Sequence, residues 1–256
     1  MTDRPDPSRQ SRSPARLRLD QRLVDLGHAD SRARAQALIA AGVVTVNGAP
    51  AAKPSQKVQD DAIDVTGDPC PWVSRAALKL THALDQFGLT PTGVALDVGA
   101  STGGFTEVLL ARGAAVVHAL DVGHGQLHPR IAEETRVISH EGVNARAIPP
   151  GLIPPVDWIV SDVSFISLEK ALPGPMALAR PNARLIALIK PQFEAGRGRV
   201  GKGGLVKDAA VHAEVRARIH AFLTHAGWSV TGEAESPIAG GDGNLEFLIT
   251  ARAPRG

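Results

Sequence analysis

The chain has 256 residues, of which 43% are apolar, and this is enough for one large domain or for a small and a medium one. A single cysteine, Cys70, excludes an internal disulfide and a cysteine-based metal site, and it fits a reducing, cytoplasmic location. Residues 1–60 carry ten Lys/Arg against six Asp/Glu, within a formal net charge of +2. This excess of basic residues near the N-terminus suggests a polyanionic partner, although such an excess more often belongs to an ordinary solvated surface.

The first part of the chain predicts a tail followed by a small α+β module. Residues 1–15 are rich in Pro, Ser, Asp and Arg, which predicts a disordered tail rather than a signal peptide. Residues 16–66 predict two short helices, the second capped by Asp30 or Ser31, followed by two β-branched strands. The dipeptide Asn47-Gly48 predicts a tight turn after the first of these strands.

A second domain is expected over residues 74–256, after a linker at 67–73 that is rich in proline and glycine. Ser74 is placed to cap its first helix, which runs to about Phe87. Strand-like runs then alternate with helical stretches, which predicts a mostly parallel seven-stranded sheet between helices, with an antiparallel strand at the end. The expected strands are 94–98, 115–122, 137–139, 158–163, 185–189, 228–230 and 245–250. No run approaches the ~20 apolar residues of a membrane span, so membrane insertion is not expected.

A glycine-rich turn, Asp97-Val98-Gly99-Ala100-Ser101-Thr102-Gly103-Gly104, links the first of these strands to a helix at 105–112. Bare backbone at a helix N-terminus lets a ligand approach closely, and ligands of such sheets bind at the carboxyl ends of the strands. Ser101 stands where a dinucleotide fingerprint requires glycine, so the spacing suits a methyltransferase better. Asp121 ends the next strand, at the position where an acidic residue of nucleotide-binding domains accepts hydrogen bonds from ribose hydroxyls. The alternative is an ordinary turn between strand and helix.

Four charged residues are candidates for chemistry at the same edge of the sheet. Asp162 ends the fourth predicted strand and Lys190 the fifth, so both should open beside the cofactor. Glu246 lies among apolar residues of the last strand and needs a partner. Lys79 lies off the apolar stripe of its helix. Each of the four, taken alone, is more often a surface charge or a loop cap.

Six motifs resemble the TlyA (hemolysin A) family, in which an RNA-binding module of the type found in ribosomal protein S-four precedes an FtsJ-like ribose methyltransferase domain. The likeness runs in order from about Arg16 to about Thr250. The motifs are Ser74-Arg75-x-x-x-Lys79-Leu80, Leu96-Asp97-x-Gly99-Ala100-Ser101-Thr102-Gly103-Gly104-Phe105-Thr106, Asp121-Val122-Gly123-x-Gly125-Gln126-Leu127, Ser161-Asp162-x-Ser164-Phe165-Ile166-Ser167-Leu168, Lys190-Pro191-Gln192-Phe193-Glu194 and Gly243-Asn244-x-Glu246. In one departure, relatives often carry Arg before the aromatic residue of the linker, whereas this chain reads Cys70-Pro71-Trp72-Val73, so coupling between the domains is expected to differ.

The resemblance implies a Rossmann-like class I methyltransferase domain that uses S-adenosylmethionine to methylate cytidine 2′-hydroxyls in ribosomal RNA, 16S, 23S or both. It implies that Lys79, Asp162, Lys190 and Glu246 form the catalytic Lys-Asp-Lys-Glu tetrad of ribose methyltransferases. The cofactor-binding residues would be Asp97, Gly99, Ala100, Ser101, Thr102, Gly103, Gly104 and Asp121. The partners would be ribosomal RNA or ribosomal subunits, and no metal is expected.

The expected mechanism is alignment plus removal of one proton, because a ribose hydroxyl is a poor nucleophile while a sulfonium methyl is already activated. We expect Lys190 to accept the 2′-proton, with burial and the second cation, Lys79, lowering its pKa from about 10.4. Asp162 and Glu246 would orient the lysines. Base-directed enzymes place Asn/Asp-Pro-Pro-aromatic where this chain has Lys190-Pro191-Gln192-Phe193, which favours a hydroxyl target.

RNA contacts are expected from basic residues of the first module and from the glycine-rich stretch 196–204, which we interpret as a lid or RNA clamp, with a flexible loop as the alternative. These residues are Arg16, Arg18, Arg22, Arg32, Arg34, Lys53, Arg197 and Arg199. Three other functions remain open at this point. They are methylation of another RNA group, a membrane-active (hemolysin-like) role, and ribosome binding by an inactive methyltransferase fold.

Overall fold

The computed structural model describes residues 16–29, 31–67 and 70–256, apart from the side chain of Arg197. The chain divides into two compact units, Met1–Pro71 and Trp72–Gly256. Three predictions lie outside the described residues: the tail at 1–15, the cap at Asp30, and the linker at 68–69.

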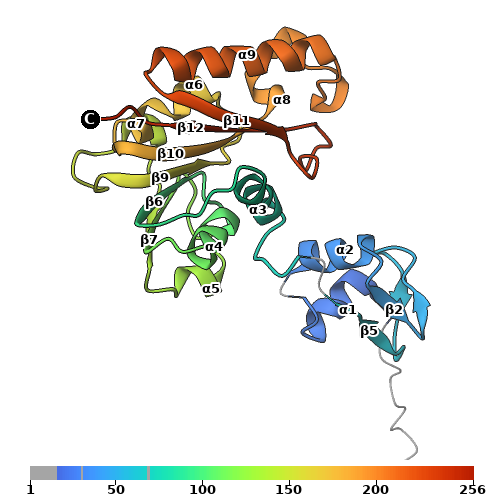
Figure 1. Ribbon diagram of the computed structural model, residues 1–256. Helices are drawn as coiled ribbons and strands as arrows, with labels where there is room; N and C mark the ends of the chain where they lie inside the picture. The colour runs from blue at the N-terminus through green and yellow to red at the C-terminus, as the bar shows by residue number, and fades with distance from the viewer. Residues whose placement is uncertain (1–15, 30, 68–69) are drawn as a thin grey trace, which may run out of the picture. The chain divides into compact units, whose positions relative to one another are not determined.

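The first unit is a small α+β fold in which two helices, α1 (Leu19–Asp25) and α2 (Arg32–Ala40), pack on short strands (Figure 1). Ser31 caps α2, because its Oγ accepts a hydrogen bond from the backbone N–H of Arg34 at 3.2 Å. The predicted turn Asn47-Gly48 joins two antiparallel strands, and both of its residues have positive φ. The strands are β1 (Leu17–Arg18), β2 (Val44–Val46), β3 (Ala49–Pro50), β4 (Lys57–Val58) and β5 (Ile63–Val65), in a β3-β2-β5 sheet and a β1-β4 pair. Two-residue strands carry no readable period, so β1, β3 and β4 were not predicted.

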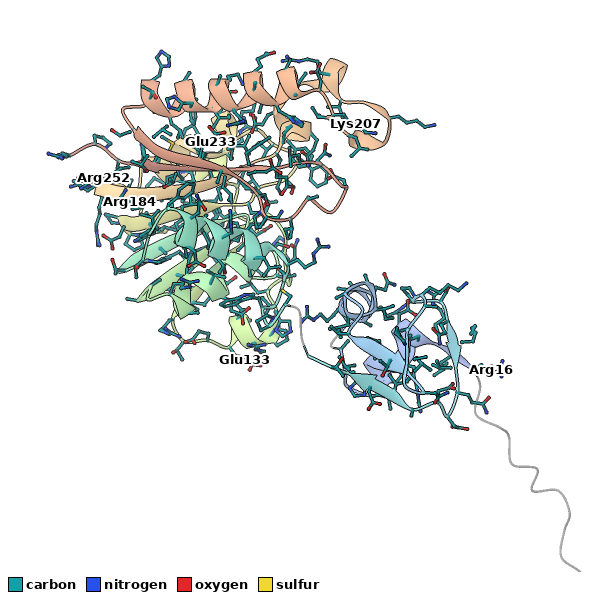
Figure 2. The ribbon with its side chains drawn as sticks, turned by 45° about the vertical axis from the view of Figure 1, so that its right-hand side comes forward. Arg16, Glu133, Arg184, Lys207, Glu233 and Arg252 are labelled. Carbon is teal, nitrogen blue, oxygen red and sulfur yellow. The ribbon has the colours of Figure 1, made fainter. Side chains whose placement is uncertain are left out.

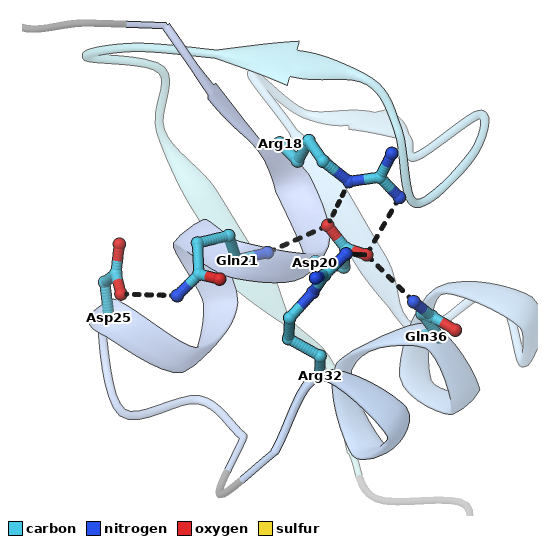
Figure 3. Close-up of polar contacts among 6 residues, drawn as sticks. All are labelled: Arg18, Asp20, Gln21, Asp25, Arg32 and Gln36. Carbon is cyan, nitrogen blue, oxygen red and sulfur yellow. Dashed lines mark hydrogen bonds and ion pairs between the residues drawn. The ribbon is translucent and has the colours of Figure 1, made fainter.

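A buried carboxylate, Asp20, organises polar side chains of the first unit (Figure 3). It accepts hydrogen bonds from Arg18 Nε at 2.9 Å, Arg32 Nη2 at 3.0 Å and Gln36 Nε2 at 2.9 Å. The Arg18 guanidinium in particular, helped by Gln36 and Arg32, holds the pKa of Asp20 well below its usual range. Two arginines expected to meet RNA are therefore held in place by a carboxylate.

The second unit contains a seven-stranded, mostly parallel sheet with helices on both faces, which confirms the predicted α/β class (Figure 1). Its order is β11-β12-β10-β9-β6-β7-β8, and β12 is antiparallel to both of its neighbours. The chain runs from β6 out to β8 and returns to β9 on the other side of β6, so the topological switch point lies between β6 and β9. The strands are β6 (Val94–Val98), β7 (Val116–Asp121), β8 (Val137–Glu141), β9 (Val156–Ser161), β10 (Ala179–Ile189), β11 (Ser229–Glu235) and β12 (Phe247–Arg252).

Helices α3 and α4 cover one face of this sheet, and α6 and α9 cover the other (Figure 1). The helices are α3 (Ala76–Gln86), α4 (Gly104–Ala111), α5 (Pro129–Ala132), α6 (Leu168–Ala171), α7 (Pro173–Met176), α8 (Pro191–Glu194) and α9 (Ala209–His225), with single 3-10 turns at Ala145–Ala147, Arg197–Arg199 and Lys202–Gly204. Within the described part of the chain, none of the helices is both long and apolar enough to cross a membrane.

The alternation of side chains along the central strands decides which face carries the charged residues. Leu185, Ala187 and Ile189 of β10 pack in the core beneath α9, while Ile186 and Leu188 pack in the core beneath α3. The same alternation places Lys190, which directly follows β10, on the α3 side. Glu246 directly precedes β12, and by the same period it also lies on the α3 side, because Leu248 does.

Candidate active site

The glycine-rich turn connects β6 to α4 at the switch point, as its sequence predicted. The structure places Gly99 and Gly103 at φ values of 84° and 91°, which only glycine adopts without strain. A Cβ on Gly104 would overlap the hydroxyl of Ser74. The prediction that Ser74 caps α3 is wrong, because the residue at the cap position is Arg75, whose side chain forms no cap hydrogen bond. Ser74 lies instead against the turn, a tertiary contact without a local sequence signal.

Two adjoining cavities open beside this turn, with volumes of ≈ 380 Å³ and ≈ 300 Å³. Both are lined by Gly99, Ser101, Asp162 and Ser164. The larger one also takes in Asp121, Val122, Gln126, Asn144 and Phe165, and the smaller one Ser74, Ala100, Thr102, Gly104 and Lys190. The turn and the charged strand ends therefore share one continuous depression.

Two aspartates predicted to meet the cofactor differ sharply in environment. Asp121 Oδ2 accepts the backbone N–H of Ser101 at 2.8 Å, which ties the end of β7 to the turn. Asp97 is fully buried, and its Oδ2 accepts a hydrogen bond from Thr106 Oγ1 at 2.7 Å. Its Oδ1 has no hydrogen-bond partner among the described residues. Burial, and to a lesser degree the charges of Asp162 and Asp121, raise the pKa of Asp97 to about 7.

The four candidate catalytic residues come together as two lysine–carboxylate pairs. Lys79 Nζ, from α3, lies 2.6 Å from Glu246 Oε2, and both side chains are buried. Lys190 Nζ lies 2.6 Å from Asp162 Oδ1. The two pairs are close enough for their charges to interact, since Lys79, Lys190 and Asp162 all influence the pKa of Glu246. Burial outweighs the two lysines and raises the pKa of Glu246 above its usual value.

Two residues that the sequence reasoning did not select also belong to this site. Lys190 Nζ donates a hydrogen bond to Ser164 Oγ at 2.8 Å, so the lysine has two partners from the segment after β9. Phe165 is 91% exposed although it is aromatic, and it has a φ of 66°. Both stand in the motif Ser161-Asp162-Val163-Ser164-Phe165-Ile166, so the motif could have indicated them; their exposure could not be read from it.

The predicted RNA-binding residues have varied surroundings. Arg16 and Lys53 are exposed and form no ion pair with a described residue, and Figure 2 labels Arg16 at the surface of the first unit. Arg18 and Arg32 pair with Asp20. Arg34 donates to the carbonyl oxygen of Cys70, Arg22 has a buried Nε, and Arg199 pairs with Glu214. The side chain of Arg197 lies outside the described part of the structure. No group of His, Cys, Asp and Glu among the described residues could hold a metal ion.

Comparison with known proteins agrees with this architecture in both units. Residues 72–253 match the FtsJ-like methyltransferase family, and residues 17–64 match the S4 domain. A protein from Mycobacterium tuberculosis named 16S/23S rRNA (cytidine-2'-O)-methyltransferase TlyA is 44% identical over 93% of this chain and 90% of its own length.

Two further relatives cover both units. Hemolysin A of Brachyspira hyodysenteriae is 41% identical over 91% of this chain and 98% of its own. The solved structure of a hemolysin candidate from Streptococcus thermophilus has 37% identity and a TM-score of 0.74, and the match covers 95% of this chain and 91% of that one. The chain belongs to the TlyA family of methyltransferases, which join an S4 domain to an FtsJ-like domain.

Proposed function

We propose that this protein transfers a methyl group from S-adenosylmethionine to the ribose 2′-hydroxyl of a cytidine in ribosomal RNA, in the cytoplasm. The observation that carries the proposal is the presence of two lysine–carboxylate contacts, one buried and one partly buried, with Lys190 and Asp162 lining the cavity beside the glycine-rich turn. The substrate class follows from the name of the Mycobacterium tuberculosis relative and from the S4 domain in front.

The residues around the turn fit S-adenosylmethionine. The glycine backbone of the turn borders both cavities, so a ligand can approach it closely. Asp97 borders neither cavity, but its Oδ1, buried without a described partner directly before the turn, is an acceptor suited to a cationic group of the ligand. Asp121 ends the strand beside the larger cavity, where a carboxylate would accept hydrogen bonds from ribose hydroxyls. When bound, the cofactor supplies an activated methyl group.

The chain's own residues supply alignment and a proton acceptor. Lys190 Nζ lies 2.6 Å from Asp162 Oδ1 and donates a hydrogen bond to Ser164 Oγ at 2.8 Å. To act as the base it has to be the neutral amine, whose lone pair would face the 2′-hydroxyl and take its proton. Lys79, fixed by Glu246, would donate to the same oxygen and help to place it.

Phe165 suits the nucleobase next to that hydroxyl. Its ring is 91% exposed and borders the larger cavity, directly after Ser164. Bases of single-stranded or extruded nucleotides stack on such aromatic rings. Because every base can stack on an aromatic ring, Phe165 would bind the nucleotide without contributing to base specificity.

The decisive experiment offers labelled S-adenosylmethionine with each separate ribosomal subunit and with the corresponding protein-free RNA. The expected product is a methylated ribose that makes the adjacent bond resistant to alkaline cleavage, at a cytidine. A methyl group on a base would contradict the proposed reaction, and absence of transfer to all four substrates would contradict the substrate.

Cofactor affinity is expected to rise as the pH increases through about 7, because Asp97 has a raised pKa of about 7 and a cationic ligand prefers the ionised carboxylate. Below that value each pH unit should cost up to about tenfold in affinity. Calorimetric titration of S-adenosylmethionine at pH 6, 7 and 8 measures this. Asp97→Asn should bind weakly and without the pH dependence, and a flat profile in the parent protein would contradict the role of Asp97.

Exposed cations of the S4 domain are expected to bind RNA phosphates. The double change Arg16→Gln with Lys53→Gln should weaken RNA binding and reduce the slope of log affinity against log salt by roughly 0.7–0.9 for each lost phosphate contact. Arg136→Gln, which removes one exposed arginine paired with Glu134, is the matched control. Filter binding from 50 to 200 mM salt measures the slope, and an unchanged slope would exclude these two residues from the RNA contact.

A further inference from the structure

Lys190 is held by one segment, the residues between β9 and α6. Both of its partners, Asp162 and Ser164, lie there, at 2.6 and 2.8 Å from Nζ. The direction left for a substrate hydroxyl therefore depends on where this segment lies. A displacement of the segment would turn the lysine even if the lysine's own strand stayed in place.

The backbone of this segment has a strained conformation at one residue. Phe165 has a φ of 66°, in the left-handed region, where a bulky residue is strained by about 1–2 kcal/mol. Its ring is 91% exposed, and its ring contact is with Phe193 of α8, at a centroid distance of 5.0 Å. Such a conformation persists only where the surrounding structure holds it, so the segment needs an anchor elsewhere.

The anchor is a carboxylate four residues beyond Lys190. Glu194 Oε1 accepts the backbone N–H of Leu168 at 2.8 Å. Leu168 is the first residue of α6, and the preceding Ser167 does not cap this helix with its side chain. Glu194 thus satisfies an N-terminal donor of α6 from a different part of the chain.

The two connections join the same pair of segments. Lys190 and Glu194 are separated by one short helical turn, α8, which begins at Pro191. At one end of the turn Lys190 meets the segment after β9, and at the other end Glu194 holds the point where that segment enters α6. The short α8 turn therefore fixes the distance between Lys190 and Glu194, and these two contacts fix where the segment between β9 and α6 lies.

The buried carboxylate of Glu194 needs a partner of opposite charge, and Arg218 of α9 supplies it. Glu194 is 6% exposed, and burial raises its pKa. Arg218 of α9 donates from Nη2 to Glu194 Oε2 at 3.0 Å and to the Glu194 carbonyl oxygen at 2.8 Å. Its Nε lies 3.2 Å from Oε2 of the more exposed Glu169. The anchor is therefore fastened to the longest helix of the unit.

We propose that Glu194 is a positioning residue for methyl transfer, which fixes Asp162 and Ser164 against Lys190 by holding the N-terminus of α6. It touches neither cofactor cavity, and it acts on the reaction only through the segment that it holds. The proposal rests on the proposed function, because Lys190 has to be the residue that meets the substrate hydroxyl.

Three substitutions separate this role from simple stabilisation. Glu194→Ala removes both contacts, and kcat is expected to fall about tenfold or more, since small misplacements of reacting groups have large effects on rate. The KM for S-adenosylmethionine should stay within about twofold, because cofactor contacts are untouched. Glu194→Gln keeps an oxygen for the Leu168 N–H and should restore most of kcat. Glu169→Gln removes only the exposed partner of Arg218 and is the matched control.

All rates are normalised to the fraction of molecules that binds cofactor, so that lost folding is not counted as lost catalysis. If Glu194→Ala does not fold, Glu194→Asp replaces it, because the shorter carboxylate keeps its charge for Arg218 but withdraws from Leu168; it should show the same fall in kcat. An unchanged normalised kcat in Glu194→Ala or Glu194→Asp would overturn the proposal. An equal fall in kcat in Glu194→Gln and Glu194→Ala would also overturn it. A parent protein that methylates no ribosomal RNA in the same assay would contradict the proposed function instead.

Discussion

Replacing Lys190 by alanine is expected to abolish methyl transfer while leaving the affinity for S-adenosylmethionine nearly unchanged. The amine is the group placed to accept the 2′-proton, and a positioned base contributes about 10²–10⁴-fold to the rate. It borders only the smaller cavity, whereas the larger one, with Asp121, keeps its lining. Single-turnover methylation of ribosomal RNA, with cofactor binding measured on the same preparation, tests this prediction.

The control for this experiment is Lys207→Ala, which removes an exposed lysine outside both cavities (Figure 2). It should methylate at the parent rate. A folded Lys190→Ala protein that binds cofactor and also methylates at the parent rate would falsify the assignment of the base.

Breaking the second pair is expected to cost stability as well as activity. Glu246→Ala leaves the Lys79 ammonium buried without its 2.6 Å partner, and removal of one partner of a buried ion pair costs about 3–5 kcal/mol. The free energy of unfolding of the second unit should fall by about this amount. All three tryptophans, Trp72, Trp158 and Trp228, belong to this unit, so urea unfolding followed by their fluorescence reports on it alone.

The double substitution Lys79→Met with Glu246→Leu distinguishes stability from chemistry. Replacing both charges by apolar side chains of similar size is often neutral or stabilising, so most of the lost stability should return. Methylation should not return, because Lys79 and Glu246 are no longer there to help place the hydroxyl against Lys190. Recovery of activity together with stability would show that this pair serves the fold rather than the reaction.

Much of the second unit could be predicted from local patterns. The strand at 94–98 has the predicted bounds, because an apolar run between a turn and a glycine loop defines both of its ends. Some strands extend further than predicted, and β10, for example, begins at Ala179 rather than at 185; β9 and β12 are shifted by two residues from the predicted 158–163 and 245–250. Residues 180–182, Arg180, Pro181 and Asn182, are exposed, and the pairing with β9 is interrupted between Ala179 and Arg184, so this part of the strand leaves no apolar signal.

The gathering of the charged residues could be predicted only in outline. The rule that strand ends share one edge of the sheet placed Asp162 and Lys190 together, and the structure agrees. The partner of each lysine could not be read from the sequence. Glu246 pairs with Lys79, 167 positions away, because α3 packs across the face on which both side chains lie.

The order of apolar and glycine-rich segments was sufficient to specify the α/β class, the switch point and the motifs at its edge, because periodicity and turn chemistry are local properties of the chain. Contacts between distant segments were decided by packing: Ser74 against Gly104, Asp20 among its arginines, and Glu194 beneath α6. Side chains such as these read as ordinary polar residues in the sequence. Their roles follow from burial, because a polar group removed from water must find a partner wherever the fold brings one.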